Sequence, residues 1–323
     1  MIAEVRLWGR TIGALSLDEE REVAAFQYDP AFVRSGIELS PLMMPLSDRI
    51  YEFPALSRDT FHGLPGLLAD SLPDTFGNAL IDAWLATHGR APENFSAVER
   101  LCYTGKRGMG ALEFAPAMGP RARKTTALEI DALVRLAGEI LTHRQNLHGH
   151  FRHTGKAHAL QDILRVGTSA GGARAKAVIA WNRVTNEVRS GQIAAGDGFE
   201  YWLLKFDGVS GNKDKELDDP RGYGAIEYAY HLMATAAGIT MSECRLLEEN
   251  GRRHFMTRRF DRYGRGEKLH MQSLGAMAHF DFNQAGAHAY EQALLVIRQL
   301  HLPMAAVEEQ FRRMVFNIVA RNQ

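Results

Sequence analysis

The stretch from Gly167 to Lys176, GTSAGGARAK, contains residue types that could bind a phosphate. Glycines let main-chain N–H groups approach an anion, and a nearby arginine or lysine adds positive charge. A single glycine-rich segment is, however, more often a hairpin or an interdomain loop. It is not a P-loop, because the Gly-Lys-Ser/Thr ending is absent, and it is not a GxGxxG fingerprint. The rest of the chain has to decide between the two interpretations.

Two charged residues further along could complete a nucleotide site. Lys205 lies within the apolar run YWLLKFD, and Glu227 lies near the start of the predicted helix AIEYAYHLMATAAG. In phosphoryl transfer, a lysine on a central strand reaches the α- and β-phosphates, and a glutamate on the next helix holds that lysine. Taken singly, Lys205 could be a solvent-facing edge-strand residue, and Glu227 a first-turn carboxylate that the helix dipole favours. We expect the pair to converge beneath the glycine turn.

The run HFMTRRFDRY follows as a candidate hinge between two lobes. Its backbone would meet an adenine ring, and Asp261 would bind the ribose. The alternative is that Arg259, Phe260, Asp261 and Arg262 form a charged turn that closes a buried strand.

The elements that must position these residues follow from local patterns. In the first third, EVRLWGRTIGALSL and VAAFQYDP indicate short strands, and the spacing of Phe76, Leu80, Trp84 and Leu85 indicates a helix closed by Gly89. A domain boundary is expected near the basic, Pro/Gly-containing segment PAMGPRARKTT, giving domains at 1–118 and 119–323. KAVIAWN and FEYWLLKFD indicate strands, whereas RVTNEVRSGQ indicates a turn region. Asn250-Gly251 indicates a hairpin turn, and two amphipathic helices are expected at 290–301 and 303–321.

The bulk composition limits the class of protein. The chain has 323 residues, with 38 Lys and Arg against 38 Asp and Glu, so no overall charge draws it to nucleic acid or to anionic lipid. Its two cysteines cannot form a disulfide framework and lack the spacing of a zinc site. No apolar run approaches the length of a membrane span. A cytoplasmic protein is therefore expected, and the predicted mixture of helices and strands indicates the α+β class.

The sequence resembles the HipA-type serine/threonine kinase toxins of bacterial type II toxin–antitoxin systems. VRLWGRTIGALS, GLPGLLADSLPD and GKRGMGALEF resemble the small N-terminal domain of that family, and TSAGGARAK, WLLKFD, IEYAYHLMATAAGI and RRFDR resemble its kinase domain. The resemblance implies a two-lobed protein-kinase-like fold preceded by a small α+β domain. It also implies ATP and Mg²⁺ as cofactors, a HipB-like helix-turn-helix antitoxin that contacts operator DNA, and an aminoacyl-tRNA synthetase as substrate.

The resemblance also implies roles for individual residues. Ser169 corresponds to the autophosphorylated loop serine, and Thr168 beside it could substitute for it. The backbone of Ala170, Gly171, Gly172 and Ala173 would cover the phosphates, with Lys205 as the ATP lysine and Glu227 as its partner. The segment formed by Arg258, Arg259, Phe260 and Asp261 corresponds to the nucleotide hinge.

The chain departs from the family pattern at its end. In the family, the last helix runs into a loop with an aspartate base and a His-x-Lys-Asn turn whose asparagine holds magnesium. No matching residues occur in 1–323, so the base and the magnesium ligands would have to follow Gln323. HFDFN at 279–283 is interpreted as a loop.

This departure predicts an inactive chain with an incomplete C-terminal lobe. As written, the chain is expected to bind nucleotide weakly, to phosphorylate nothing, and to expose the apolar stripes of its last two helices. It is either a fragment of an active kinase or a shortened inactive relative that only binds partners.

Overall fold

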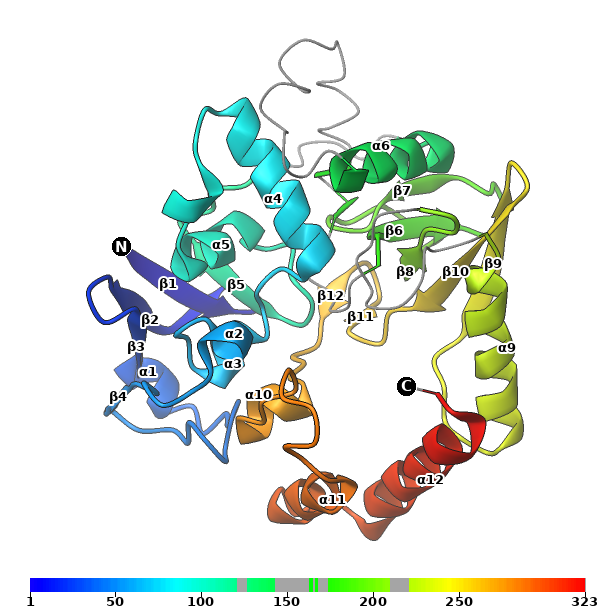
Figure 1. The fold of residues 1–323 in the computed structure, drawn as a ribbon. Coiled ribbons are helices and arrows are strands. Elements are labelled where there is room, and N and C mark those ends of the chain that lie inside the picture. Colours follow the sequence, from blue (N-terminus) through cyan, green and yellow to red (C-terminus); the bar gives the residue numbers. More distant parts are fainter. Residues whose placement is uncertain (121–126, 143–162, 165, 168–173, 210–220, 323) are drawn as a thin grey trace.

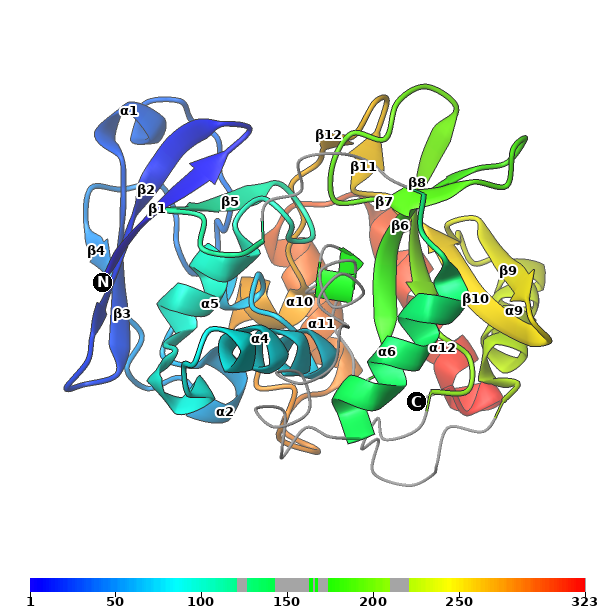
Figure 2. The same cartoon turned by 90° about the horizontal axis from the view of Figure 1, so that it is seen from above.

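The structure is a computed structural model, and it describes residues 1–120, 127–142, 163–164, 166–167, 174–209 and 221–322. The described elements form two five-stranded antiparallel sheets with helices around them (Figures 1 and 2). The α+β class expected from the sequence is thus confirmed.

Three of the sequence predictions lie outside the described residues. The expected autophosphorylation sites Ser169 and Thr168 are among them, as is the expected phosphate cover from Ala170 to Ala173. Gln323, after which the catalytic base and the magnesium ligands are expected, is also outside the described part. These expectations therefore stay predictions.

The first sheet has the strand order β4-β3-β2-β1-β5. Its strands are β1 (Ile2–Leu7), β2 (Arg10–Asp18), β3 (Val23–Tyr28), β4 (Ile50–Tyr51) and β5 (Leu112–Ala115). The accompanying helices are α1 (Pro30–Val33), α2 (Arg58–Phe61), α3 (Gly66–Ala69), α4 (Thr75–Thr87) and α5 (Ala97–Thr104), with a 3₁₀ turn at Pro92–Asn94. Apolar side chains alternate along β1, where Ala3, Val5 and Leu7 are buried. This alternation places one face of the sheet on a core shared with α3 and α5.

The second sheet has the strand order β7-β6-β8-β10-β9. Its strands are β6 (Lys176–Asn182), β7 (Val188–Ser190), β8 (Phe199–Lys205), β9 (Cys244–Glu249) and β10 (Arg252–Arg258). Helix α6 (Ile130–Thr142) packs its apolar face on this sheet, and α9 (Tyr223–Ala236) contacts β9 and β10. The remaining elements are β11 (Arg262–Tyr263), β12 (Glu267–Lys268), α10 (Leu274–Ala278), α11 (Tyr290–Gln299) and α12 (Met304–Ala320).

Strand β7 and helix α12 differ in how well the sequence predicts them. The sequence predicts only a turn region for RVTNEVRSGQ, but Val188–Ser190 forms β7, because it pairs with Ile179–Trp181 of β6. Turn residues lie on both sides of this strand, at 183–185 and at 191–192. The apolar stripe of α12 is exposed as expected. Phe311, Val315 and Ile318 are all exposed, and α12 has no buried residue. No helix in the described part of the chain combines the length and apolarity that crossing a bilayer requires.

Helix α4 lies between the two sheets (Figures 1 and 2). Its buried residues Phe76, Ala79, Leu80 and Ala83 belong to the same hydrophobic core as α6, β6 and β8. The larger core of the protein therefore includes residues from both sides of the expected domain boundary after residue 118. The boundary itself stays a prediction.

The β9–β10 hairpin turns at Asn250-Gly251 as the sequence predicts. Both residues have positive φ, 49° and 72°, as a two-residue turn of this kind requires. Replacing Gly251 by valine should lower the free energy of unfolding by about 1–2 kcal/mol, because a β-branched residue is strained in the left-handed region. The urea midpoint measures this effect, and Glu248→Ala on the exposed end of β9 is the control. An unchanged midpoint for Gly251→Val would contradict the turn geometry.

Candidate functional site

Lys205 and Glu227 form an ion pair, as the sequence predicts. Lys205 is the last residue of β8, which is hydrogen-bonded between β6 and β10 in the middle of the sheet. Its Nζ lies 3.0 Å from Oε1 and 2.9 Å from Oε2 of Glu227 on α9. The lysine side chain is 34% exposed, so its ammonium group keeps access to solvent. An anionic ligand could therefore reach it.

Gly224 lets α9 approach the sheet closely enough for this contact. It is buried in the first turn of the helix. A Cβ atom at this position would lie 1.9 Å from the carbonyl oxygen of Arg253 on β10. Only glycine fits at this distance. Because Glu227 is three residues further along, the close approach brings it over the end of β8.

Two more cations of this region come from the start of β6. Arg174 Nη1 lies 3.2 Å from Glu227 Oε1, and its guanidinium stacks 4.0 Å from the centre of the Tyr223 ring. Lys176 Nζ lies 2.5 Å from Oδ2 of Asp74, which precedes α4. Both partners of this second pair are almost fully buried, at 1% and 4% exposed. Among the described residues, the region thus holds three cationic side chains and two carboxylates.

For both members of the buried pair, Asp74 and Lys176, burial is the largest influence on the pKa. Burial lowers the pKa of Lys176, and the neighbouring Lys205 adds to the effect, while Asp74 and Glu227 act against it. Burial likewise raises the pKa of Asp74, although Lys176 and the backbone N–H groups at the start of α4 oppose the rise. Lys205 and Arg174 share the Glu227 carboxylate, and two positive charges beside each other favour a phosphate ligand.

The expected hinge residues are divided between surface and interior. Arg258 is exposed and lies 3.8 Å from both Glu200 and Glu243. Phe260 is 64% exposed. The backbone N–H of Arg259 donates to the carbonyl of Tyr201, and its side chain is buried. The structure brings none of these residues into contact with Lys205 or Glu227, so their nucleotide role stays a prediction.

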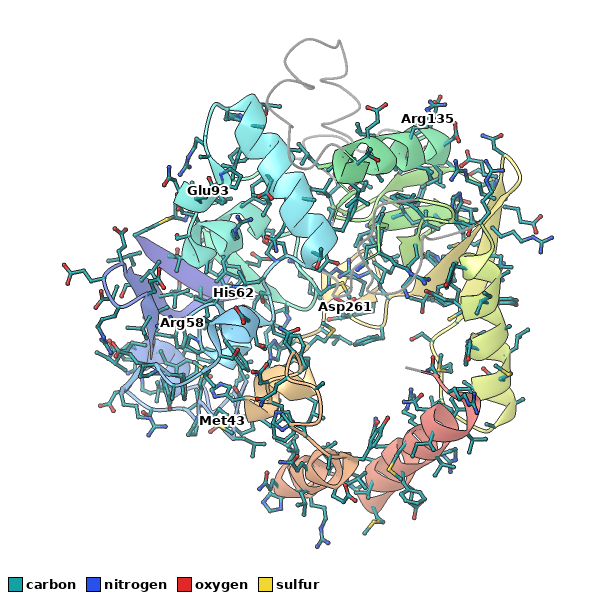
Figure 3. All side chains as sticks on the ribbon, in the orientation of Figure 1. Met43, Arg58, His62, Glu93, Arg135 and Asp261 are labelled. Atoms are coloured by element: carbon teal, nitrogen blue, oxygen red, sulfur yellow. The ribbon has the colours of Figure 1, made fainter. Side chains whose placement is uncertain are left out.

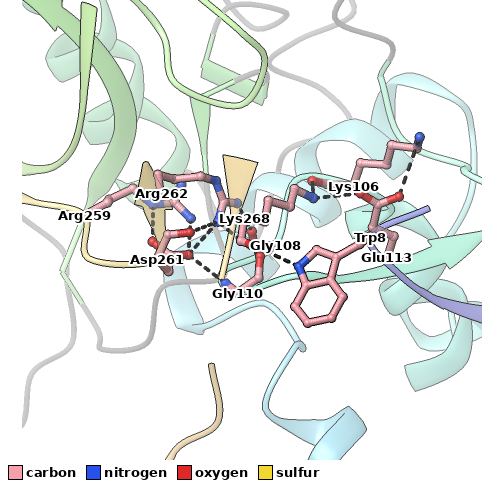
Figure 4. A network of polar contacts seen from close by, with 9 residues as sticks. All are labelled: Trp8, Lys106, Gly108, Gly110, Glu113, Arg259, Asp261, Arg262 and Lys268. Carbon is pink, nitrogen blue, oxygen red and sulfur yellow. Dashed lines mark hydrogen bonds and ion pairs between the residues drawn. The ribbon is translucent and has the colours of Figure 1, made fainter. Parts of the chain in front are cut away.

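Asp261 occupies a buried ion network rather than an open ribose site (Figure 4). Arg259 donates to both of its carboxylate oxygens, at 2.8 and 2.7 Å, and Arg262 donates to Oδ2 at 2.7 Å. The backbone N–H of Gly110, from the N-terminal domain, also donates to Oδ2 at 2.7 Å. This arrangement is a charged turn that closes a buried strand, and the expected ribose contact of Asp261 stays a prediction. Figure 3 shows Asp261 near the middle of the molecule, with Arg135 at its periphery.

The same network continues into the N-terminal domain. Lys268 donates to Glu113 at 3.0 Å and to the carbonyl of Lys106 at 2.8 Å, and its own carbonyl accepts from the indole N–H of Trp8 at 2.7 Å (Figure 4). The β11–β12 segment is therefore a polar joint between the two domains.

Sequence reasoning missed Asp74 as a site residue. The signal is present in PDTFG, where an aspartate after a proline caps a helix, and Asp74 Oδ1 does accept from the backbone N–H of Gly77 at 2.6 Å. The sequence gives no sign that the other carboxylate oxygen of Asp74, Oδ2, pairs with Lys176.

A ligand set for Mg²⁺ is not found in the described part of the chain. Within those residues, no group of three or more His, Cys, Asp or Glu side chains could hold a metal ion. The sequence places the expected magnesium ligands and the catalytic base after Gln323, and Gln323 itself lies outside the described residues. The metal site of the complete kinase therefore stays a prediction.

Comparison with known proteins gives the family. A family model for the HipA N-terminal domain matches residues 3–115, and one for the HipA-like C-terminal domain matches residues 168–323. The chain belongs to the HipA family. Among curated proteins, no significant match was found.

A similar solved structure is HipA from a complex of the Shewanella oneidensis MR-1 toxin–antitoxin system with HipB and its operator DNA. The TM-score is 0.62 at 16% identity, and the alignment covers 99% of this chain and 70% of that chain. At this identity the likeness shows the fold. The expected HipA-like arrangement of an N-terminal α+β domain before a second domain is thereby confirmed.

Proposed function

We propose that this HipA-family chain binds ATP at the end of β8, as the nucleotide-binding part of a serine/threonine kinase toxin. The observation that carries the proposal is the ion pair between Lys205 and Glu227, 2.9 Å apart at an accessible position. Lys205 would meet the α- and β-phosphates, and Glu227 would hold its ammonium group in place. Arg174, which shares Glu227, would add a second positive charge beside the phosphates. ATP bound here would supply the phosphoryl group.

The binding partners that we propose are based on the family and on the similar solved structure. The chain is proposed to act with a HipB-like helix-turn-helix antitoxin, because the similar structure is a complex of HipA, HipB and operator DNA. With 38 basic against 38 acidic residues, this chain would contact DNA only through the antitoxin. An aminoacyl-tRNA synthetase is the proposed substrate of the complete kinase. Ser169 and Thr168 are its proposed autophosphorylation sites.

A second candidate function is a kinase fold that binds partners without phosphoryl transfer. It is favoured by the exposed apolar side chains of Phe311, Val315 and Ile318 on α12, because an exposed apolar face is typical of a surface that binds a partner. Such a protein would act as a scaffold or corepressor in the antitoxin–DNA complex. Incubation with radiolabelled ATP separates the two functions. Label on Ser169 in a full-length protein supports the kinase, whereas a full-length protein that binds the antitoxin and takes up no label supports the scaffold.

The nucleotide site itself is tested by Lys205→Met. A charge-assisted hydrogen bond contributes about 1.5–3 kcal/mol, so the substitution should weaken ATP binding by about 10–150-fold. Isothermal titration calorimetry measures the dissociation constant. Lys106→Met is the matched control, because Lys106 is an exposed lysine paired with Glu113 of β5, in the other sheet. Equal affinities for both variants would rule out Lys205 as the phosphate-binding lysine.

A further inference from the structure

Asp207 follows the end of β8, two residues after Lys205, and its carboxylate joins two other elements. Oδ1 accepts the backbone N–H of Gly222 at 2.8 Å, and Oδ2 accepts the backbone N–H of Arg253 at 3.3 Å. Gly222 immediately precedes α9, and Arg253 belongs to β10. One buried carboxylate therefore connects the end of β8 to the start of α9 and to β10.

The backbone of Asp207 is itself held by β10. Its N–H donates to Nδ1 of His254 at 3.0 Å, and its carbonyl accepts from Nη1 of Arg252 at 2.8 Å. The residue is only 3% exposed, so water does not compete for these hydrogen bonds. The carboxylate is thus a fixed acceptor for the groups that donate to it.

The start of α9 lacks a cap from its own residues. Gly222, the residue at the cap position, has no side chain. In a capping box, a carboxylate on the third helical residue accepts the backbone N–H of the cap residue, but the third residue of α9 is Ala225. Asp207 supplies this carboxylate from the end of β8 instead. Its negative charge also lies at the positive end of the helix dipole.

We propose that Asp207 is a positioning residue for nucleotide binding, which holds the start of α9 at the end of β8 so that Glu227 meets Lys205. This inference rests on the proposed ATP site. Glu227 lies in the second turn of α9, so it moves with the first turn that Asp207 holds. Because Asp207 is buried, it acts through Glu227 and not by contact with the nucleotide.

A double-mutant cycle on the full chain tests this role, with ATP dissociation constants measured by calorimetry. Asp207→Ala removes both acceptors, and we expect ATP to bind about tenfold more weakly, because Glu227 moves away from Lys205. In a Glu227→Ala chain, the same substitution should change the affinity by less than about twofold, because the carboxylate through which Asp207 acts is then absent. A purely structural role would give the same loss in both chains.

The matched control is Asp29→Ala. Asp29 also accepts a backbone N–H at the start of a helix, that of Ala31 in α1, but α1 accompanies the first sheet. Its ATP affinity should be unchanged, and circular dichroism verifies that each variant is folded. Should Asp207→Ala not fold, Asp207→Asn takes its place. An amide offers one oxygen to the two N–H donors, so we expect a loss of about threefold that disappears in the Glu227→Ala chain.

The outcomes distinguish this inference from the proposed function. Suppose that the unmodified chain binds ATP and that Glu227→Ala weakens the binding. If the substitution of Asp207 then leaves the affinity unchanged, or costs the same in both chains, the inference is overturned and the ATP site stands. If the unmodified chain does not bind ATP, or Glu227→Ala binds it equally well, the proposed site fails and the inference fails with it.

Discussion

Replacing Asp261 by alanine should lower the free energy of unfolding by about 3–5 kcal/mol. The substitution leaves two arginines without their common partner in the interior, because the side chains of Arg259 and Arg262 are only 1% and 5% exposed. The backbone N–H of Gly110 loses its acceptor as well. Breaking a buried pair costs far more than its formation gains, because the remaining charges are desolvated and uncompensated.

Urea denaturation followed by circular dichroism measures this loss. Asp197→Ala is the matched control, since it removes the same side chain from an ion pair with Arg265 in which both partners are about four-fifths exposed. An exposed pair contributes at most about 1 kcal/mol, so the control should differ little from the unmodified chain. A loss for Asp261→Ala as small as that of the control would mean that the network does not hold the domains together.

The carboxylate of Asp261 is also expected to make the free energy of unfolding depend on pH in the acid range. Burial acts to raise the pKa of Asp261, but the hydrogen bonds and positive charge of Arg259, together with Arg262, outweigh it and lower the pKa. A carboxyl with a lowered pKa in the folded state stabilises the fold above its unfolded pKa of about 3.9, and this contribution is lost as the pH falls through the folded value. We therefore expect unfolding free energy to fall below about pH 4, and less steeply in Asp261→Asn than in the unmodified chain.

The second large effect is expected at Gly224. Alanine here would place a methyl group 1.9 Å from the carbonyl of Arg253, so α9 must move away from β10. A shift of about 1 Å at a site can cost about 100-fold in function, and overpacking costs about 1–3 kcal/mol of stability. Gly224→Ala should therefore weaken ATP binding by at least about tenfold, because Glu227 moves with the helix.

The control for Gly224 is the same substitution in another helix. Gly138 of α6 has open space where a Cβ would lie, so Gly138→Ala should leave ATP binding unchanged and stabilise the helix by up to about 1 kcal/mol. Calorimetry and urea denaturation of the two variants give both quantities. If Gly224→Ala kept its ATP affinity, the close approach of α9 would not be what positions Glu227.

Much of the fold is encoded in local patterns that the sequence displays. The alternation along β1, the Asn250-Gly251 turn and the apolar runs around Lys205 each predict an element that the structure contains. The contact between Lys205 and Glu227 is also predictable, because the order of strand, helix and hairpin is enough to place them together. Helix α5 is not among the predicted elements, although Ser96 and Glu99 form a capping box at its start.

The remaining features depend on contacts between distant parts of the chain. Asp261 and Gly110 are 151 positions apart, and a charged turn and a nucleotide hinge have the same local sequence. The ion pair between Asp74 and Lys176 could not be predicted either, because the two residues are 102 positions apart in the chain. Strand β7 has only three residues and is defined by its pairing with β6, which no periodicity could show in so short a segment.

The position of α4 in the core beneath β6 and β8 has a consequence for how such proteins can evolve. Recombination that exchanged the first 118 residues for those of a distant relative would replace Phe76, Leu80 and Ala83, and with them one wall of the recipient's interior. A viable chimera would need compensating changes in α6 and in the second sheet. The two halves are thus constrained to diversify together, even though they are recognised as separate modules.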